Sequence, residues 1–387
     1  MGLSITPLVV FDAQNLLSYI KRFSRGFVPC GVSNEDYTIL CTTYNSSVPL
    51  FNIEYLRQNR ERVIICDDGS KSPVFTRYLE ELKKEFIVVT NGKKRFIKWH
   101  LLSKTLEYVK TKYVVFLDDD SIPKGDIGKA VQVLEEQNAD LSSVKVLPIN
   151  HSGILQNLQN MEYHFAMLTR EFRPWLTSGA CMIGTTKLLK EIMASHSFFH
   201  QGGDIEVGII ARRLRRKVIY VRFVVETRVP SKFKEWFVQR SKWMSGNFRH
   251  TIINCPKCMF DPFYVFYFTG MLWMMLLFKW LSNFTSPLLI LCILTILYVP
   301  FNILANWKII RVVTKESYWY TFLLFPIYSL FQVLILPFVG MMLYFVEVKK
   351  FKSWGVISKC SQINNLIMKE GQEEQEFIFP PLPVETL

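Results

Sequence analysis

The stretch KYVVFLDDDSIP, residues 112–123, places an apolar run directly before three consecutive carboxylates. The β-branched and aromatic residues of this run predict a buried strand that ends where the acids begin. Adjacent carboxylates raise each other's pKa unless a cation neutralises them. Because side chains alternate along an extended segment, we expect Asp118 and Asp120 to share a face. Such a pair suits Mg²⁺ or Mn²⁺, and a solvated acidic turn is the alternative interpretation.

Three further apolar runs precede this one and alternate with helical patterns. The expected strands are residues 37–44, 62–67 and 86–90, and the expected helices are residues 73–85 and 98–111. This alternation predicts an α/β domain with a mainly parallel central sheet that is covered on both faces. Ligands of such sheets bind outside the carboxyl ends of the strands. We therefore expect the polar clusters after the four strands to line one crevice: residues 42–45, 67–70, 90–95 and 118–121.

Two of these clusters have their own alternatives. Asp67 and Asp68 stand before Gly69, so they can direct a carboxylate at the N–H of a nucleobase or form only an Asp-Gly turn. Lys93 and Lys94 follow the third strand, where a phosphate would find cations, although a solvated loop would read the same way.

The composition of the chain changes after residue 250. Residues 1–36 have modest amphipathicity, which suits a helix on a membrane surface or one docked on the protein. Residues 37–250 form the expected α/β domain. Residues 251–348 carry long apolar stretches and predict three or four transmembrane segments, the last stretch being one tilted helix or two helices broken near Pro337. Residues 349–387 are first basic and then typical of a disordered tail.

The net charge of the chain limits the classes of partner that it is expected to bind. Lys and Arg number 46 and Asp and Glu 33, which gives a formal net charge of +13. A basic membrane protein meets acidic lipid headgroups or phosphorylated substrates, and no recognition helix, zinc finger or RNA-binding signature supports nucleic acid. The basic linker at residues 308–317 predicts a multi-pass protein whose α/β domain is cytoplasmic.

Three more clusters can carry chemistry. Ser178 and Gly179 belong to a turn of small residues that would let a ligand approach the backbone. Asp204 lies where a polar loop opens a helix, so it is either a base facing the crevice or a partner of the helix dipole. Trp236 and Trp243 stand among cations, where they can stack on a sugar ring or anchor the chain at a membrane interface. Interfacial anchoring suits Trp236 better than Trp243.

The order of these motifs resembles the family 2 glycosyltransferases with the GT-A fold. It is most similar to the membrane-embedded polysaccharide synthases, namely hyaluronan, chitin and cellulose synthases. The resemblance covers about residues 37–249 and continues more loosely through the apolar region. The motifs are Asp-Asp-Gly at 67–69, Asp-x-Asp at 118–120, Ser-Gly-Ala at 178–180, Gly-Asp-x-Glu at 203–206 and Gln-x-x-x-Trp at 239–243.

The resemblance implies a role for each matched residue. Asp118 and Asp120 would hold the metal ion, Mg²⁺ or Mn²⁺. The residues implied in binding the nucleotide-sugar donor are Tyr44, Asp67, Asp68, Lys93, Lys94 and Asp119, and Ser178 and Gly179 match the floor of the acceptor site. The implied catalytic set is Asp204 as the base, with Gln239, Arg240, Lys242 and Trp243, whose indole would meet the acceptor sugar.

The chain departs from the family pattern at two of these positions. Gly203 replaces the usual acidic residue before the base, and Lys242 stands where the family has Arg. A lysine offers a point charge instead of a bidentate clamp on a diphosphate, and whether Arg240 compensates is open at this level.

The function implied is inverting transfer of a sugar, with metal dependence, from a nucleotide-diphosphate sugar to a growing β-linked polysaccharide. The family favours a UDP-sugar as donor. One alternative is a non-processive enzyme that adds a single sugar to a lipid acceptor. A second alternative, from another class, is an inactive membrane scaffold that only binds nucleotide sugar.

Overall fold

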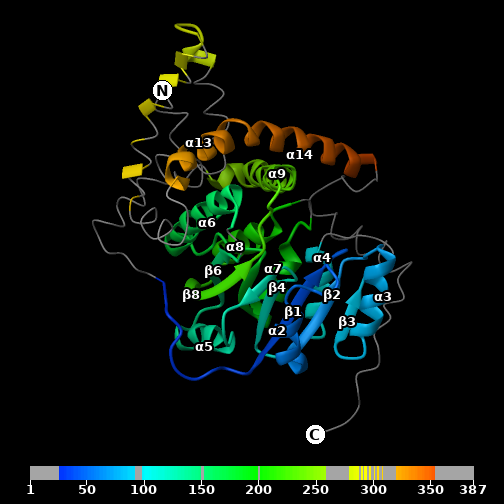
Figure 1. Cartoon of the computed structure of the whole chain (residues 1–387). Coiled ribbons are helices and arrows are strands. Elements are labelled where there is room, and N and C mark those ends of the chain that lie inside the picture. The colour runs from blue at the N-terminus through cyan, green and yellow to red at the C-terminus, as the bar shows by residue number, and fades with distance from the viewer. Residues whose placement is uncertain are drawn as a thin grey trace. The chain divides into compact units, whose positions relative to one another are not determined.

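The computed structural model describes residues 26–91, 98–149, 152–198, 201–258 and, with gaps, 279–353. The described chain forms two compact units (Figure 1). The sheet unit contains Gly26–Leu147 and Arg173–Arg228, and the helical unit contains Pro148–Phe172 and Val229–Lys352. Of the residues in the predicted domain at 37–250, Pro148–Phe172 and those from Val229 onward are grouped with the helical unit.

The sheet unit is built on an eight-stranded mixed sheet with strand order β3-β2-β1-β4-β7-β6-β8-β5. Strands expected from the sequence are present within a few residues of their predicted bounds. In chain order the strands are β1 (Tyr37–Thr43), β2 (Val63–Asp67), β3 (Ile87–Thr90), β4 (Tyr113–Asp118), β5 (Ser121–Pro123), β6 (Leu141–Pro148), β7 (Cys181–Thr185) and β8 (Val218–Thr227).

One half of the sheet is parallel, as predicted. β1 pairs with β2 and β4, and β2 pairs with β3, all in parallel. The register places Thr43 beside Asp67, and Thr42 beside Asp118. The carboxyl ends of these strands therefore meet at one edge of the sheet, where the polar clusters follow them.

The other half of the sheet is antiparallel, so the prediction of a mainly parallel sheet is wrong here. β7 pairs with β4 and with β6 in antiparallel fashion, and β5 pairs with β8 in the same way. Cys181 at the start of β7 lies opposite Leu117 near the end of β4. β7 therefore runs opposite to both of its neighbours in the sheet.

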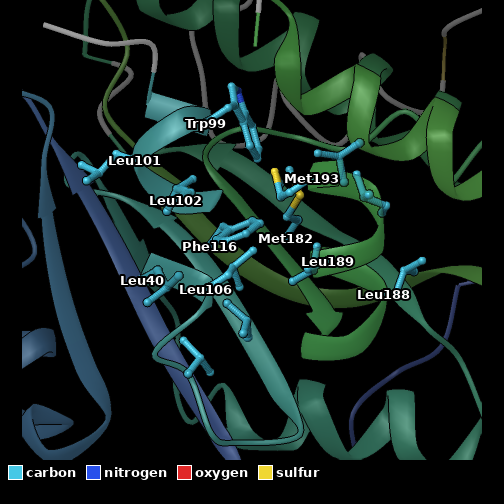
Figure 2. Close-up of a cluster of buried hydrophobic side chains, with 14 of the residues drawn as sticks. Leu40, Trp99, Leu101, Leu102, Leu106, Phe116, Met182, Leu188, Leu189 and Met193 are labelled. Atoms are coloured by element: carbon cyan, nitrogen blue, oxygen red, sulfur yellow. The ribbon is translucent and has the colours of Figure 1, made fainter. Parts of the chain in front are cut away.

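Helices of the sheet unit supply the apolar side chains that cover the sheet. α4 and α7 face β4 and β7, and Figure 2 shows Leu102 and Leu189 directed toward Phe116 and Met182. These four side chains are at most 2% exposed, and each contributes about 1.5–3 kcal/mol by its burial. The helices are α2 (Ile53–Gln58), α3 (Pro73–Leu82), α4 (Lys98–Leu106), α5 (Gly128–Glu136), α7 (Thr186–Ser195) and α8 (Gly203–Arg213).

The helical unit has an apolar core of its own. It contains α6 (Ile154–Phe172), α9 (Phe233–Cys258), α13 (Thr321–Leu334) and α14 (Leu336–Ser353). Buried residues of the first three helices and the start of α14 form one cluster, which includes Met161, Trp236 and Phe325. Trp236 is 1% exposed, so the prediction that it anchors the chain at a membrane interface is wrong.

The last apolar stretch forms two helices, with the break at Ile335, two residues before Pro337. None of the helices in the described part of the chain combines the length and apolar character needed to cross a bilayer. Most of the first two predicted spans, at residues 261–281 and 286–307, lies outside the described residues. Residues 1–25 and 354–387, with the predicted N-terminal helix and the tail, also lie outside them.

Candidate active site

Asp118 ends β4 at the edge where the parallel strands meet. Its Oδ1 accepts hydrogen bonds from Thr42 Oγ1 at 2.7 Å and from Lys98 Nζ at 2.7 Å. The side chains of Asp118 and Lys98 are 29% and 28% exposed, so solvent and ligands can reach this ion pair. The pair therefore forms an accessible polar centre on an otherwise apolar strand end.

Lys98 connects Asp118 to Asp204. Lys98 Nζ lies 3.4 Å from the carbonyl oxygen of Gly179, and the Gly179 N–H donates to Asp204 Oδ2 at 2.8 Å. Burial acts to lower the pKa of Lys98, but the carboxylates of Asp118, Asp204 and Asp120 outweigh it and raise that pKa. Two acids of one turn and a third that is distant in the sequence thus act on a single ammonium group.

Asp120 completes this acidic group from the turn after β4. The strand ends at Asp118 and the next two residues form a turn, so strict strand alternation does not apply to the pair. Asp120 Oδ1 accepts from Ser121 Oγ at 3.0 Å and from Thr227 Oγ1 at 3.3 Å. Burial, followed by the charges of Asp118 and Asp119, raises the pKa of Asp120 to about 7.

The donor atoms fit a divalent cation shared with a ligand. Asp118 and Asp120 offer hard carboxylate oxygens, and the pKa of Asp120 is raised first by burial and then by the charges of Asp118 and Asp119, which a bound cation would offset. Within the described residues, no group of three His, Cys, Asp or Glu side chains could hold a metal ion. Two protein carboxylates completed by water and phosphate oxygens are the usual arrangement for Mg²⁺.

The three acids predicted to bind the donor, Asp119, Asp67 and Asp68, lie in different environments. Burial raises the pKa of Asp119, whose backbone N–H donates to the Thr42 carbonyl at 3.2 Å. Asp67 accepts from Ser70 N, Ser70 Oγ and Thr90 Oγ1, so its carboxylate holds the turn after β2, and its role in donor binding stays a prediction. Asp68 Oδ1 accepts from Asn91 Nδ2 at 3.0 Å, which places this acid at the end of β3.

The remaining predicted donor-binding residues are only partly placed. Tyr44 is half-buried directly after β1, and Asn45 beside it accepts from the N–H groups of Lys71 and Ser72. This contact ties the loop after β1 to the loop after β2. Lys93 and Lys94 lie outside the described residues.

The packing around α8 explains why Gly203 replaces an acidic residue. A Cβ atom at Gly203 would overlap the indole of Trp99, which packs on the start of α8. At Gly208, five residues further along α8, a Cβ atom would overlap the backbone carbonyl of Trp175. Both glycines let α8 approach its neighbours closely, and the Asp204 carbonyl accepts from Thr177 Oγ1 in the same contact. The departure at Gly203 therefore has a steric cause.

The motif predicted to meet the acceptor lies on α9 in the helical unit. Trp243 is 43% exposed, and Lys242 is also exposed. Arg240 is buried against Glu162 of α6, with its Nη2 2.9 Å from Glu162 Oε2. Its Nη1 donates to Gln239 Oε1 at 2.5 Å. Arg240 is therefore committed to protein partners and does not replace the missing arginine at Lys242.

Sequence reasoning missed Lys98 and Glu162. Lys98 opens α4, where the helix dipole disfavours a cation unless an anion lies nearby. Glu162 lies in a helix whose preceding turns bury uncharged amides, so a carboxylate there needs a partner. In each case the signal in the sequence is a charged residue at a position that disfavours its charge.

A mixed α/β sheet whose carboxyl edge gathers an Asp-x-Asp turn and a distant aspartate is the arrangement of a GT-A glycosyltransferase. A family model described as "Glycosyl transferase family group 2" matches residues 113–346, more than half of the chain. The protein belongs to this family and is a glycosyltransferase. No curated protein sequence matches it significantly.

Solved structures of glycosyltransferases resemble the chain at low sequence identity. The mannosyltransferase PcManGT from Pyrobaculum calidifontis, in complex with GDP-Man and Mn²⁺, has a TM-score of 0.50 at 14% identity and covers 92% of this chain and 99% of its own. For S. aureus TarS 1–349 the TM-score is 0.37 at 14% identity, over 56% of this chain and 72% of that chain. The likeness to PcManGT supports the fold alone.

Proposed function

We propose that the protein is an inverting glycosyltransferase that moves a sugar from a nucleotide-diphosphate sugar to a growing β-linked polysaccharide. The observation that carries this proposal is the connection Asp118–Lys98–Gly179–Asp204, which joins the metal-type acid to the base-type acid within one group of contacts. The sequence resemblance favours a UDP-sugar. PcManGT, the structural relative, was determined with GDP-Man and Mn²⁺, which supports the donor class.

In this proposal Asp204 deprotonates the acceptor hydroxyl. The Gly179 N–H holds Asp204 Oδ2 at 2.8 Å, which fixes the direction of the carboxylate. A base positioned in this way contributes about 10²–10⁴-fold to the rate. The hydroxyl oxygen attacks the sugar C1 as the bond to the diphosphate breaks, and the configuration at C1 inverts.

The diphosphate leaving group needs positive charge. Asp118 and Asp120 would hold Mg²⁺ or Mn²⁺, which would neutralise the charge that develops on the departing diphosphate. Lys98 adds a protein cation beside Asp118, and its nitrogen can turn toward a phosphate when the donor binds. Trp243 would hold the acceptor sugar by stacking on it, so proximity supplies much of the remaining rate.

We also propose that the helical unit contacts a bilayer, with the sheet unit on the cytoplasmic side, where nucleotide sugars are found. Six apolar side chains on α13, on α14 and at the break between them are 44–66% exposed, which supports an apolar partner for these helices. They are Leu323, Ile327, Ile335, Met342, Phe345 and Val346.

The test is to incubate the full chain, purified in detergent, with a panel of labelled UDP- and GDP-sugars, with Mn²⁺, with Mg²⁺ and with a chelator. We expect one donor to be consumed in a metal-dependent reaction and the label to enter a product of high mass. A single labelled lipid would instead identify the non-processive alternative. Donor binding without transfer or hydrolysis would contradict the proposal and indicate an inactive scaffold.

A further inference from the structure

Glu162 is the centre of a buried polar network in the helical unit. Its Oε2 accepts from Arg240 Nη2 at 2.9 Å, from Tyr328 Oη at 2.5 Å and from Gln332 Nε2 at 3.1 Å. Its Oε1 accepts from Arg240 Nε at 3.0 Å. Because these donors come from α9 and α13, a single carboxylate on α6 joins three helices.

Arg240 transmits this arrangement to the acceptor motif. Its Nη1 donates to Gln239 Oε1 at 2.5 Å, and its Cζ lies 4.0 Å from the ring centroid of Trp243. The indole of Trp243 therefore rests on a guanidinium group whose other edge is held by Glu162. The Arg240 side chain is 1% exposed, while Trp243 is 43% exposed. The network thus fixes one face of Trp243 and leaves the residue accessible.

The chemistry of the pair suits positioning better than ligand binding. A guanidinium group presents its donors in a rigid plane, so a bidentate carboxylate sets the orientation of that plane. Glu162, Gln239 and Gln159 receive the hydrogen bonds of Arg240. A planar group held in this way offers an aromatic ring a platform of defined direction.

We propose that Glu162 is a positioning residue for the acceptor motif: it holds Arg240, and through Arg240 it sets the orientation of Trp243 and Gln239. The part of this proposal that concerns the acceptor rests on the proposed function. Tyr328 and Gln332 extend the same control to α13, since both donate to the Glu162 carboxylate. A movement of α13 would therefore change the platform beneath Trp243.

The direct test is fluorine NMR of the full chain labelled with fluorotryptophan in detergent. The chain has nine tryptophans, and Trp243→Phe identifies the resonance of Trp243. We expect Glu162→Gln to shift and broaden that resonance, while those of Trp99 and Trp175 in the sheet unit stay in place. Glu235→Gln is the matched control, because Glu235 is an exposed acid on α9 that lies 3.9 Å from Lys232.

The kinetic test compares transfer with hydrolysis of the donor by water. We expect Glu162→Gln to lower the ratio of transfer to hydrolysis about tenfold or more, because a displaced Trp243 misaligns the acceptor and leaves the donor site intact. In a Trp243→Ala background the same substitution should have little further effect, since residues that act through one another are not additive. A general structural defect would instead add to the loss.

The outcomes separate this proposal from the proposed function. An unmoved Trp243 resonance in a folded Glu162→Gln variant overturns the positioning role, whatever the enzyme transfers. If Glu162→Gln moves the Trp243 resonance but the unmodified protein transfers no sugar, the positioning role is supported and the proposed function is overturned. If Glu162→Gln does not fold, Tyr328→Phe removes one donor and keeps the ion pair. Tyr328→Phe should shift the Trp243 resonance by less than the shift expected for Glu162→Gln, and the absence of any shift would overturn the proposal.

Discussion

The two units of the molecule each contain one ion pair beside a predicted functional aspartate or tryptophan, and the two pairs differ in kind. In the sheet unit Lys98 and Asp118 meet at 2.7 Å, with side chains 28% and 29% exposed. In the helical unit Arg240 and Glu162 meet at 2.9 Å, with side chains 1% and 21% exposed. The first pair is accessible, and the second is enclosed among three helices.

The difference indicates which contacts can change during a reaction. A lysine is a point charge on a flexible stem and can exchange a carboxylate for a phosphate, whereas a buried arginine fork is fixed by several acceptors at once. The site that must bind and release a charged donor uses the exchangeable cation. The motif that must present an aromatic surface in one direction uses the fixed cation.

The largest expected effect concerns the base. Asp204→Asn should lower sugar transfer about 10²–10⁴-fold, because the amide cannot accept the hydroxyl proton. Donor binding, measured by calorimetry, should stay close to that of the wild type, since the substitution keeps the size of the side chain. Asp36→Asn is the control: Asp36 precedes β1 at the opposite edge of the sheet, where it accepts from Lys112 N. Equal losses in both variants would contradict the role of Asp204.

The second prediction concerns the buried cation. Arg240→Met should destabilise the helical unit by about 1–3 kcal/mol, because the partly buried Glu162 carboxylate loses its charged partner and keeps only the donors Tyr328 and Gln332. The measurement is unfolding in urea, followed by the fluorescence of the buried Trp236. Arg240→Met combined with Glu162→Gln should recover part of the loss, since the unpaired charge is then removed as well. A double variant less stable than Arg240→Met alone would contradict this account.

The parallel half of the fold could be predicted from the sequence because local signals there agree with tertiary structure. The runs that became β1, β2, β3 and β4 are apolar, short and bounded by polar turns, and each was predicted within a few residues. The antiparallel half could not be predicted in this way. β7 pairs antiparallel with β4 and β6, and no local pattern in Cys181–Thr185 indicates the direction of a strand.

The candidate site follows the same division. Asp118, Asp120 and Asp204 were selected by motif, and the structure gathers all three around Lys98, while their chemical roles remain predictions. The donor-binding role of Asp67 stays a prediction, and no motif indicates that its carboxylate also accepts from Ser70 in the following turn and from Thr90 on β3. Glu162 acts across three helices, and contacts of that range have no signature in a single stretch of sequence.

The third prediction concerns Lys98, the more accessible of the two cations, which is replaced by methionine as Arg240 was. Lys98→Met should change the free energy of unfolding by no more than about 1 kcal/mol, since partly exposed ion pairs contribute little. Sugar transfer should nevertheless fall about 10²-fold, the loss typical of removing one group that stabilises developing charge. Thermal unfolding and turnover of the same preparation provide the two measurements. A large loss of stability with normal turnover would reverse the comparison between the two units.

The smallest expected effect is a pH dependence of stability that arises from Asp120. Burial and the neighbouring carboxylates raise its pKa from 3.8 to about 7, so between these values the folded protein keeps a proton that the unfolded chain has lost. The stabilising contribution is therefore fully present below pH 4 and is lost as the pH rises through 7.

Without metal, Asp120→Asn should raise the melting temperature at pH 8 by a few degrees and change it less at pH 5. Added Mn²⁺ should stabilise the wild type at pH 8 and not the variant, because the cation relieves the same repulsion. If Asp120→Asn changed the melting temperature equally at both pH values, Asp120 would not be the titrating group. The Asp118–Lys98 pair would then already balance the charge of the site.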